Sequence, residues 1–298
     1  MPRVDILLPT YNGERYIQAQ ITSLLEQTHL NIRIYIRDDG STDGTASIVE
    51  NLSRKDSRII ILKEDNANLG LVGNINYLLS KSKADYIMYC DQDDVWFKVK
   101  VEVLLKEILH REQEFGKESP LLIHADCFVT DENLIVKGLF KGDKPLKYGL
   151  AKSLFKYYVQ GASTIFNRSL KEQIYPFIEN VYLHDRYTHL VAEIMGRRFY
   201  INKPLMYYRQ HSNNLVGSSN FFKKIKNNLS VKNLTYFGLK DKLLITTLLK
   251  DKFPQNKLLK DYLKITSSKI SRIKKIKIIF SNQIAIRFKE FIILLIKN

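Results

Sequence analysis

Cysteine is scarce in this chain, which has only Cys90 and Cys127 among 298 residues. Two cysteines cannot build the disulfide framework of a small secreted domain, so the sequence fits a reducing compartment. The paired Cys/His spacings of zinc sites are absent as well. Each cysteine is therefore expected to be a small buried side chain and not a metal ligand.

Long apolar runs are also missing. No stretch reaches the roughly 18 apolar residues that a spanning helix needs, and the longest candidate is the short segment 291–296. Met1 leads almost directly into a strand pattern, so we expect no signal peptide. The sequence therefore predicts a cytoplasmic protein without a spanning helix.

Acidic residues are few in the last quarter of the chain. Residues 1–150 hold 19 Lys and Arg against 23 Asp and Glu, whereas residues 220–298 hold 19 against only 4. Nearly all of the net charge of +16 thus lies in the C-terminal part. A basic segment of this kind favours a polyanion or an anionic membrane surface as its partner.

Strand and helix patterns alternate through the first 110 residues. Apolar runs predict strands at residues 4–8, 32–36, 59–62 and 86–89. Apolar residues at helical spacing follow these runs and predict helices between the strands. This alternation favours an α/β fold with a mostly parallel sheet. Farther on, we expect a strand at 121–124, a helix at 190–195, a strand pair around Pro204, and helices from 221 onward.

Polar residues that can bind ligands follow these strands. Thr10-Tyr11-Asn12 ends the first run, Asp38-Asp39 the second and Asp91 to Asp94 the fourth. Parallel strands bring such ends to one edge of the sheet, where α/β proteins bind ligands. No G-x-G-x-x-G motif is present, so the turns at Gly40-Ser41 and at Asn68 to Gly70 would offer backbone donors instead. We therefore predict a nucleotide pocket at this edge.

Three carboxylates, Asp91, Asp93 and Asp94, lie on the fourth of these turns. Carboxylates this close repel one another, and a hard divalent cation or a strong donor network is needed to hold them together. The phosphates of a nucleotide would complete the shell of such a cation. The alternative is a solvated acidic loop, because about one Asp-x-Asp is expected by chance in a chain of this length.

Four motifs in this order make residues 3–215 resemble family 2 glycosyltransferases of the GT-A fold. They are Pro9 to Asn12, Asp38 to Asp43, Asn66 to Asn74 with Gly70, and Asp91 to Asp94. With Trp96, His184-Asp185 and Tyr208-Arg209-x-His211-x-x-Asn214, the pattern looks most like bacterial rhamnosyltransferase-type polysaccharide enzymes. The resemblance implies a Rossmann-like catalytic domain over 1–219, followed by a basic amphipathic helical region over 220–298.

The same resemblance implies a donor site for a nucleotide diphosphate sugar. Asp93 would coordinate a divalent cation, Mn²⁺ or Mg²⁺, through the diphosphate, and Asp91 would contact the ribose or the hydration shell of the metal. Asp39, or less favourably Asp38, would accept the N3–H of a pyrimidine base. The other nucleotide-binding residues that it implies are Pro9, Thr10, Tyr11, Asn68 and Gly70.

Asp185 is the general base that the resemblance implies, because it follows Gly161 and precedes a predicted helix. Many relatives have two acidic residues at this point, whereas this chain has His184-Asp185, so His184 either orients Asp185 or only packs. A lone Asp before a helix is otherwise an N-cap. Gly161, His184 and Trp96 would contact the donor or acceptor sugar, with a place in the core as the alternative for Trp96.

Two further residues would act at the diphosphate. Arg209 could meet a phosphate bidentately, and His211 could complete the metal shell, since neutral imidazole suits Mn²⁺ better than Mg²⁺. The alternative for His211 is a histidine of a surface loop. The Gln-x-x-Arg-Trp motif of processive synthases is absent, which favours transfer of a single sugar.

The implied activity is an inverting, metal-dependent transfer of one sugar in bacterial surface polysaccharide synthesis, with dTDP-rhamnose favoured as the donor. UDP-galactose, UDP-glucose and UDP-N-acetylhexosamine are the alternatives on the same scaffold. The acceptor would be a polyprenyl-diphosphate-linked or other glycan. The basic region, with an apolar stripe at residues 284–295, would hold the enzyme on the inner face of the cell membrane, unless it is an ordinary helical subdomain.

Two other classes of protein compete with this interpretation. The pI of about 9.6 suggests a nucleic-acid-binding protein, but the basic excess lies away from the predicted pocket and no nucleic-acid motif is present, so we expect no nucleic acid partner. A non-catalytic membrane scaffold is disfavoured because Asp93 and Asp185 are both retained.

Overall fold

A computed structural model of the chain describes residues 1–63, 68–142, 148–154, 159–179, 181–212, 244–266 and 270–282. The chain divides into two compact units. Unit 1 comprises Met1–Lys144 with Val159–Gln210, and unit 2 comprises Pro145–Tyr158 with His211–Asn298. The boundary that we predicted between residues 219 and 220 lies outside the described residues.

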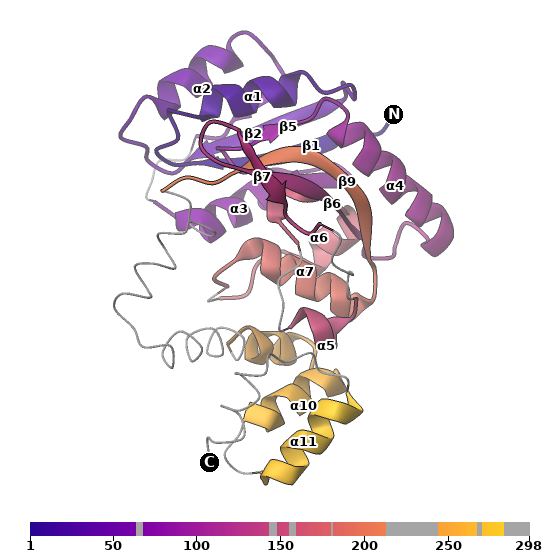
Figure 1. Cartoon of the computed structure of the whole chain (residues 1–298). Coiled ribbons are helices and arrows are strands. Elements are labelled where there is room, and N and C mark those ends of the chain that lie inside the picture. The colour runs from indigo at the N-terminus through magenta and orange to yellow at the C-terminus, as the bar shows by residue number, and fades with distance from the viewer. Residues whose placement is uncertain are drawn as a thin grey trace. The chain divides into compact units, whose positions relative to one another are not determined.

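The first half of the sheet in unit 1 is parallel (Figure 1). β1 (Val4–Thr10) pairs in parallel with β2 (Ile32–Asp38) and β4 (Tyr86–Tyr89), and β3 (Ile59–Ile61) joins β2. All seven residues of β1 are buried, as expected for a parallel strand covered on both faces. The register sets Thr10 beside Asp38 and Leu7 beside Tyr89, so the carboxyl ends of these strands meet as predicted.

Beyond β4 the sheet is mixed. β8 (Thr164–Asn167) runs antiparallel to β4 and to β6 (Leu122–Thr130), and β9 (Arg198–Arg209) is parallel to β6. The short strands β5 (Val95–Trp96) and β7 (Val136–Leu139) pair antiparallel with β9 and β6. The prediction of a mostly parallel sheet therefore holds for β1 to β4, and the second half departs from it.

β9 corrects the strand pair that we predicted around Pro204. It is one continuous strand of 12 residues, and Pro204 lies opposite Asp126 where the register with β6 shifts. Proline has no N–H to donate to the ladder, so the pairing slips there, but its φ angle is compatible with an extended chain. The strand therefore continues through Pro204 and does not turn back.

Helices cover both faces of the sheet (Figure 1). α1 (Ile17–Leu25), α2 (Thr45–Ser53) and α4 (Lys100–Phe115) share one buried apolar cluster with β1, β2 and β4. α3 (Gly70–Lys81), α6 (Arg168–Ile174) and α7 (His184–Met195) lie on the other side. Cys90 and Cys127 are free and buried, as their number predicted.

α7 begins earlier than the sequence suggested. We expected a helix at residues 190–195, but the helix starts at His184, so His184 and Asp185 belong to its first turn. Leu183 precedes the helix in an extended conformation, and an acidic residue in the first turn is favourable against the helix dipole. Thr188 Oγ1 also donates to the His184 carbonyl, at 2.9 Å. Helical spacing alone could not reveal this polar first turn.

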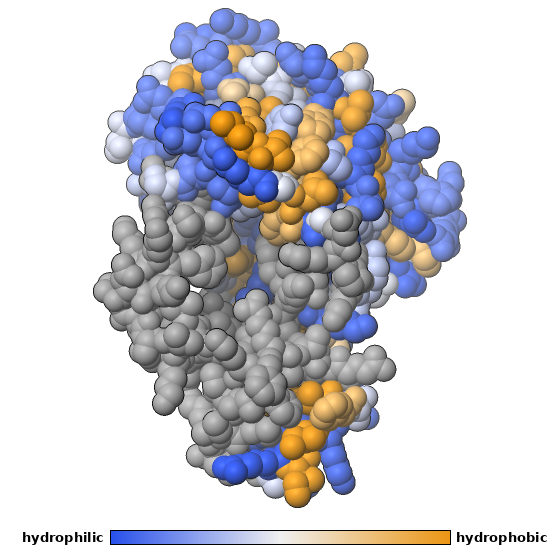
Figure 2. Space-filling view, in the orientation of Figure 1, coloured by the Kyte–Doolittle hydropathy of each residue, from blue (hydrophilic) through white to orange (hydrophobic). Residues whose placement is uncertain are grey.

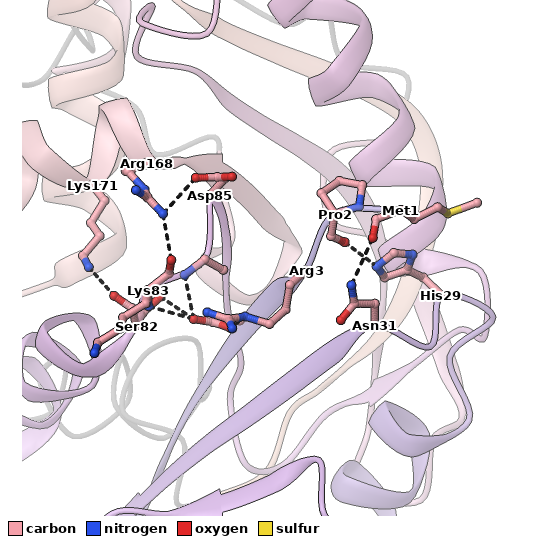
Figure 3. Close-up of polar contacts among 12 residues, drawn as sticks. Met1, Pro2, Arg3, His29, Asn31, Ser82, Lys83, Asp85, Arg168 and Lys171 are labelled. Carbon is pink, nitrogen blue, oxygen red and sulfur yellow. Dashed lines mark hydrogen bonds and ion pairs between the residues drawn. The ribbon is translucent and has the colours of Figure 1, made fainter.

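A polar network ties the turn before β4 to the amino end of β1, away from the predicted pocket (Figure 3). The buried Asp5 carboxylate accepts from Ser82 Oγ at 2.9 Å and from the Lys83 amide at 3.0 Å. On the same turn, Lys171 donates to the Ser82 carbonyl at 2.6 Å and Arg168 to the Lys83 carbonyl at 2.7 Å. Each of these groups has a protein partner, so the network stabilises the packing of this turn against β1 and α6.

The described part of unit 2 is helical. It contains α5 (Leu150–Ser153), a helix over 244–252, α10 (Lys257–Thr266) and α11 (Arg272–Ser281). α11 leaves Ile273 68% and Phe280 72% exposed, and Figure 2 shows apolar residues at this surface. The apolar stripe that we predicted at 284–295 lies outside the described residues. Within the described ranges, none of the helices has the length and apolarity to cross a membrane.

Candidate active site

The turns after β1, β2 and β4 are joined by side-chain hydrogen bonds. Thr10 Oγ1 donates to Asp38 Oδ1 at 2.7 Å, and the Ser41 amide donates to Asp38 Oδ2 at 2.8 Å. The Gln92 side chain pairs with the Tyr11 backbone, accepting from its N–H and donating to its carbonyl, both at 2.9 Å. The Tyr11 ring is 49% exposed beside these contacts. The turns thus form one continuous rim, with an aromatic face open to solvent.

Asp39 is buried and holds the start of α3. Arg37 donates to Asp39 Oδ1 at 2.6 Å, and the amides of Leu69 and Gly70 donate to its two oxygens at 2.8 Å. Asn68 supports the same turn by accepting from the Gly70 amide at 3.0 Å. A carboxylate has about four acceptor positions. The three contacts of Asp39 occupy three of these positions.

The acidic turn places Asp94 in the interior. Asp94 is fully buried; its Oδ1 accepts from the Arg209 amide at 3.0 Å, and its Oδ2 has no hydrogen-bond partner within the described part of the chain. Burial, followed by the negative charges of Asp93 and Asp91, raises the pKa of Asp94 well above its ordinary value. The sequence did not single out Asp94 among the three carboxylates, because only the fold decides which of them points inward.

Asp91 and Asp185 approach each other across a short turn. The turn is the 3₁₀ segment Gly161–Ser163 with Gln160 before it, and Gln160 Nε2 donates to Asp91 Oδ2 at 2.9 Å. A Cβ on Gly161 would lie 2.8 Å from Asp185 Cβ and 3.0 Å from its Oδ2. Burial raises the pKa of Asp91, and the charges of Asp93 and Asp185 raise it further. Three of the predicted site carboxylates therefore lie in one cluster.

His184 packs against the sheet. Its ring meets Tyr89 edge-on, with centroids 4.7 Å apart, and the residue is 5% exposed. Burial lowers the pKa of His184 despite the opposing charge of Asp185, so the ring is neutral near pH 7. Of the two alternatives for His184, packing is the one that a contact in the structure supports, and that contact is with Tyr89.

Trp96 lies in the core, which was one of the two alternatives. It is 3% exposed, and Lys100 Nζ stands 3.3 Å from the centre of its ring. A ring face occupied by a buried ammonium group is closed to a sugar. Trp96 is thus a core residue that follows the acidic turn.

Arg209 connects the acidic turn to the β6–β7 hairpin. Its Nε donates to the Asp93 carbonyl at 2.7 Å, another of its nitrogens donates to the Glu132 carbonyl, and the guanidinium lies over the Tyr16 ring at 4.6 Å. It is 6% exposed. These contacts make Arg209 a brace for the backbone that carries Asp93. His211 belongs to unit 2, whereas the other predicted site residues belong to unit 1.

Gln160 and Lys100 were missed by the sequence analysis. Gln160 had no motif to mark it. Lys100 did leave a signal, because it occupies the same face of α4 as the buried Leu104 and Ile108. A lysine within the apolar stripe of a helix is an anomaly that spacing can reveal.

The acidic cluster suits a cation that arrives together with a diphosphate. In the ranges that the structure describes, no group of three or more His, Cys, Asp or Glu side chains is arranged to hold a metal by itself. Asp91 and Asp93 nevertheless offer hard oxygen ligands. After burial, the negative charges of Asp93 and Asp185 contribute to the raised pKa of Asp91, and a bound cation would offset this repulsion. Phosphate oxygens would supply the remaining ligands.

Fold and site together define a glycosyltransferase of the GT-A class. The sequence profile of Glycosyl transferase family 2 matches residues 5–114. A glucosyltransferase of Escherichia coli, "UDP-Glc:alpha-D-GlcNAc-diphosphoundecaprenol beta-1,3-glucosyltransferase WfaP", is 31% identical over 76% of this chain and 83% of its own. The chain therefore belongs to glycosyltransferase family 2.

Further comparisons agree with this assignment. "dTDP-rhamnosyl transferase RfbG" of Shigella flexneri is 28% identical over 86% of this chain and 89% of its own. The crystal structure of S. aureus TarS 1-349 in complex with UDP-GlcNAc matches with a TM-score of 0.58 and 16% identity, covering 98% of this chain and 79% of TarS. The mannosyltransferase PcManGT of Pyrobaculum calidifontis, solved with GDP-Man and Mn2+, matches with a TM-score of 0.54 at 16% identity, over 99% and 85% of the two chains. At these identities the solved structures establish the fold alone.

Proposed function

We propose that this enzyme transfers one sugar from a pyrimidine nucleotide diphosphate donor to a hydroxyl of a glycan acceptor, with inversion at the anomeric carbon. The observation that carries the proposal is the cluster of Asp91, Asp93 and Asp185 around the turn at Gly161. A single displacement needs a base on the acceptor side and compensation for charge on the leaving diphosphate. The cluster supplies carboxylates for both purposes.

The chemistry divides between two carboxylates. Asp185 takes the proton of the acceptor hydroxyl. At the same time, the oxygen of that hydroxyl forms a bond to the anomeric carbon, and the bond from the anomeric carbon to the diphosphate breaks. Asp93, supported through its backbone by Arg209, would hold a divalent cation, and the cation would neutralise the charge that develops on the leaving diphosphate. The neutral, buried His184 would keep the start of α7 against Tyr89.

The donor that we favour is dTDP-rhamnose, because RfbG of Shigella flexneri is named a dTDP-rhamnosyl transferase and aligns over most of both chains. UDP-glucose is the second candidate, since WfaP of Escherichia coli is named for UDP-Glc and is slightly more identical. Both nucleotides carry a pyrimidine with an N3–H. The fourth acceptor position of Asp39 would receive that N3–H, and the exposed Tyr11 ring would stack on the base.

The nucleotide preference can be measured by thermal unfolding. dTDP and UDP, each with Mn²⁺, are expected to raise the Tm more than GDP or ADP, because a purine presents no N3–H to Asp39. A screen of dTDP-rhamnose, UDP-glucose, UDP-galactose and UDP-N-acetylhexosamines for metal-dependent hydrolysis then identifies the sugar. Stronger stabilisation by GDP than by dTDP and UDP would contradict the pyrimidine site.

The acceptor that we propose is a lipid-linked glycan of a bacterial surface polysaccharide pathway. WfaP is named for a diphosphoundecaprenol acceptor, and so is a glucosyltransferase of Campylobacter jejuni that is 26% identical to this chain. Such an acceptor lies at a membrane surface. α11 suits that surface because exposed Ile273 and Phe280 stand among the exposed basic residues Arg272, Lys274 and Lys277.

Attachment to membranes can be tested with phosphatidylglycerol vesicles. The full-length protein is expected to co-sediment at low salt and to dissociate as salt rises, because each basic residue contributes on the order of 1 kcal/mol at an anionic surface. Replacing both Ile273 and Phe280 by Ser should weaken vesicle binding by at least about tenfold. The matched control is Leu30→Ser, which alters an apolar residue of unit 1 that is 71% exposed. Equal binding by the three proteins would exclude α11 as the membrane contact.

A further inference from the structure

A short turn separates the two carboxylates on which transfer depends. We call residues Gln160 to Ser163 the bridging turn. Gln160 Oε1 accepts from the Ser163 amide at 2.8 Å, which fixes the orientation of the side-chain amide, so its NH₂ group faces Asp91 at 2.9 Å. At the next residue, Gly161 adjoins Asp185 so closely that a Cβ would collide with it. The position of the bridging turn thus sets the spacing between Asp91 and Asp185.

The bridging turn is held from the interior by a lysine. Lys100, the first residue of α4, is fully buried, and its Nζ donates to the Ala162 carbonyl at 2.5 Å. The same ammonium group lies 3.2 Å from Met206 Sδ and 3.3 Å from the centre of the Trp96 ring. The Ala162 carbonyl is therefore the oxygen that accepts a hydrogen bond from Lys100. Met206 and Trp96 lie at the sides of the ammonium group.

Burying this ammonium group is costly. Desolvation lowers the pKa of Lys100 to about 7, against the opposing influence of the nearby carboxylates Asp94 and Asp91. The desolvation of a buried charge costs several kcal/mol, which its interactions only partly offset. Fold stability by itself therefore gives little reason to place a lysine here, whereas its donor group holds the Ala162 carbonyl of the bridging turn.

We propose that Lys100 is a positioning residue of this enzyme, which fixes the bridging turn and thereby the spacing between Asp91 and Asp185. The inference rests on the proposed function, in which Asp185 takes the proton of the acceptor. Lys100 is fully buried, and it acts through its hydrogen bond to Ala162. A displacement of about 1 Å in such an arrangement can lower a rate by about 10²-fold.

Lys100→Met tests this role, because methionine has a similar length and lacks both the charge and the donor. Its kcat is expected to fall about 10²-fold, with the KM for the donor within about twofold of the wild-type value. Lys98→Met is the matched control: Lys98 lies two residues away, its side chain is 70% exposed, and it pairs with Glu26 at 3.4 Å on the surface. It should behave as the wild type. Lys100→Gln, which keeps a shorter donor, should have a kcat between those of the wild type and Lys100→Met.

Crystal structures of the variants test the role of Lys100 independently of whether the enzyme transfers the proposed sugar. Lys100→Met should show the bridging turn displaced relative to Asp91, and Lys98→Met should not. If the wild type transfers no sugar from any donor in the screen, the proposed function fails, and the position of the turn still decides the role of Lys100. If Lys100→Met does not fold, Lys100→Gln takes its place, with an expected loss of about tenfold in kcat. An unmoved turn, or a kcat within about twofold of wild type in a folded variant, overturns the proposal.

Discussion

Asp185→Asn is expected to lower turnover by roughly 10²–10⁴-fold, the usual contribution of a positioned general base. Asparagine keeps the shape of the side chain beside Gly161 and can remain in the first turn of α7, but it cannot accept the acceptor's proton. Donor binding should be nearly unchanged, because Asp185 faces the acceptor in the proposed arrangement. The measurement is kcat for transfer, together with the Tm shift that the donor nucleotide causes.

The control for this variant is Asp85→Asn, which alters a carboxylate that is 64% exposed and pairs with Arg168 outside the site. It should leave kcat unchanged. Near-normal turnover of Asp185→Asn would remove Asp185 from the role of base. The stereochemistry of the product is an independent check, since retention of the donor's anomeric configuration would overturn the single displacement.

Asp93→Ala is expected to lower transfer by at least about 10³-fold, because the charge on the leaving diphosphate would lose the cation held beside it. The wild type should likewise lose activity in a chelator and regain it with Mn²⁺ or Mg²⁺. The Tm of the nucleotide-free variant should stay the same or rise, since removing one carboxylate relieves its repulsion with Asp91 and Asp94. Wild-type transfer that persists in excess chelator would contradict the metal assignment.

Much of the first half of the fold could be predicted from local sequence patterns. Four apolar runs with helical spacing between them predicted β1 to β4, and the rule for parallel strands placed Thr10, Asp38 and Asp91 at one edge of the sheet. The structure confirms this edge through the register of Thr10 with Asp38. These predictions succeeded because the spacing of apolar residues is a local property, and each buried strand repeats it.

The boundaries in the second half were harder to predict. The first turn of α7 is polar and gave no apolar period, so its start was placed too late. The extended path of β9 through Pro204 depends on its pairing with β6, a partner far away in the sequence. In both places, contacts with other elements outweigh the local signal on which the prediction rested.

The sequence by itself determined the family, the order of the motifs and the residue types available for the chemistry. Only the tertiary structure decided that Trp96 is a core residue, that Asp94 is the carboxylate turned inward, and that His184 packs on Tyr89. It also brought Gln160 to Asp91 and Lys100 to Ala162 across separations of 69 and 62 residues. The physical reason is that burial and hydrogen bonding depend on which elements pack together, and a pattern within one element does not carry that information.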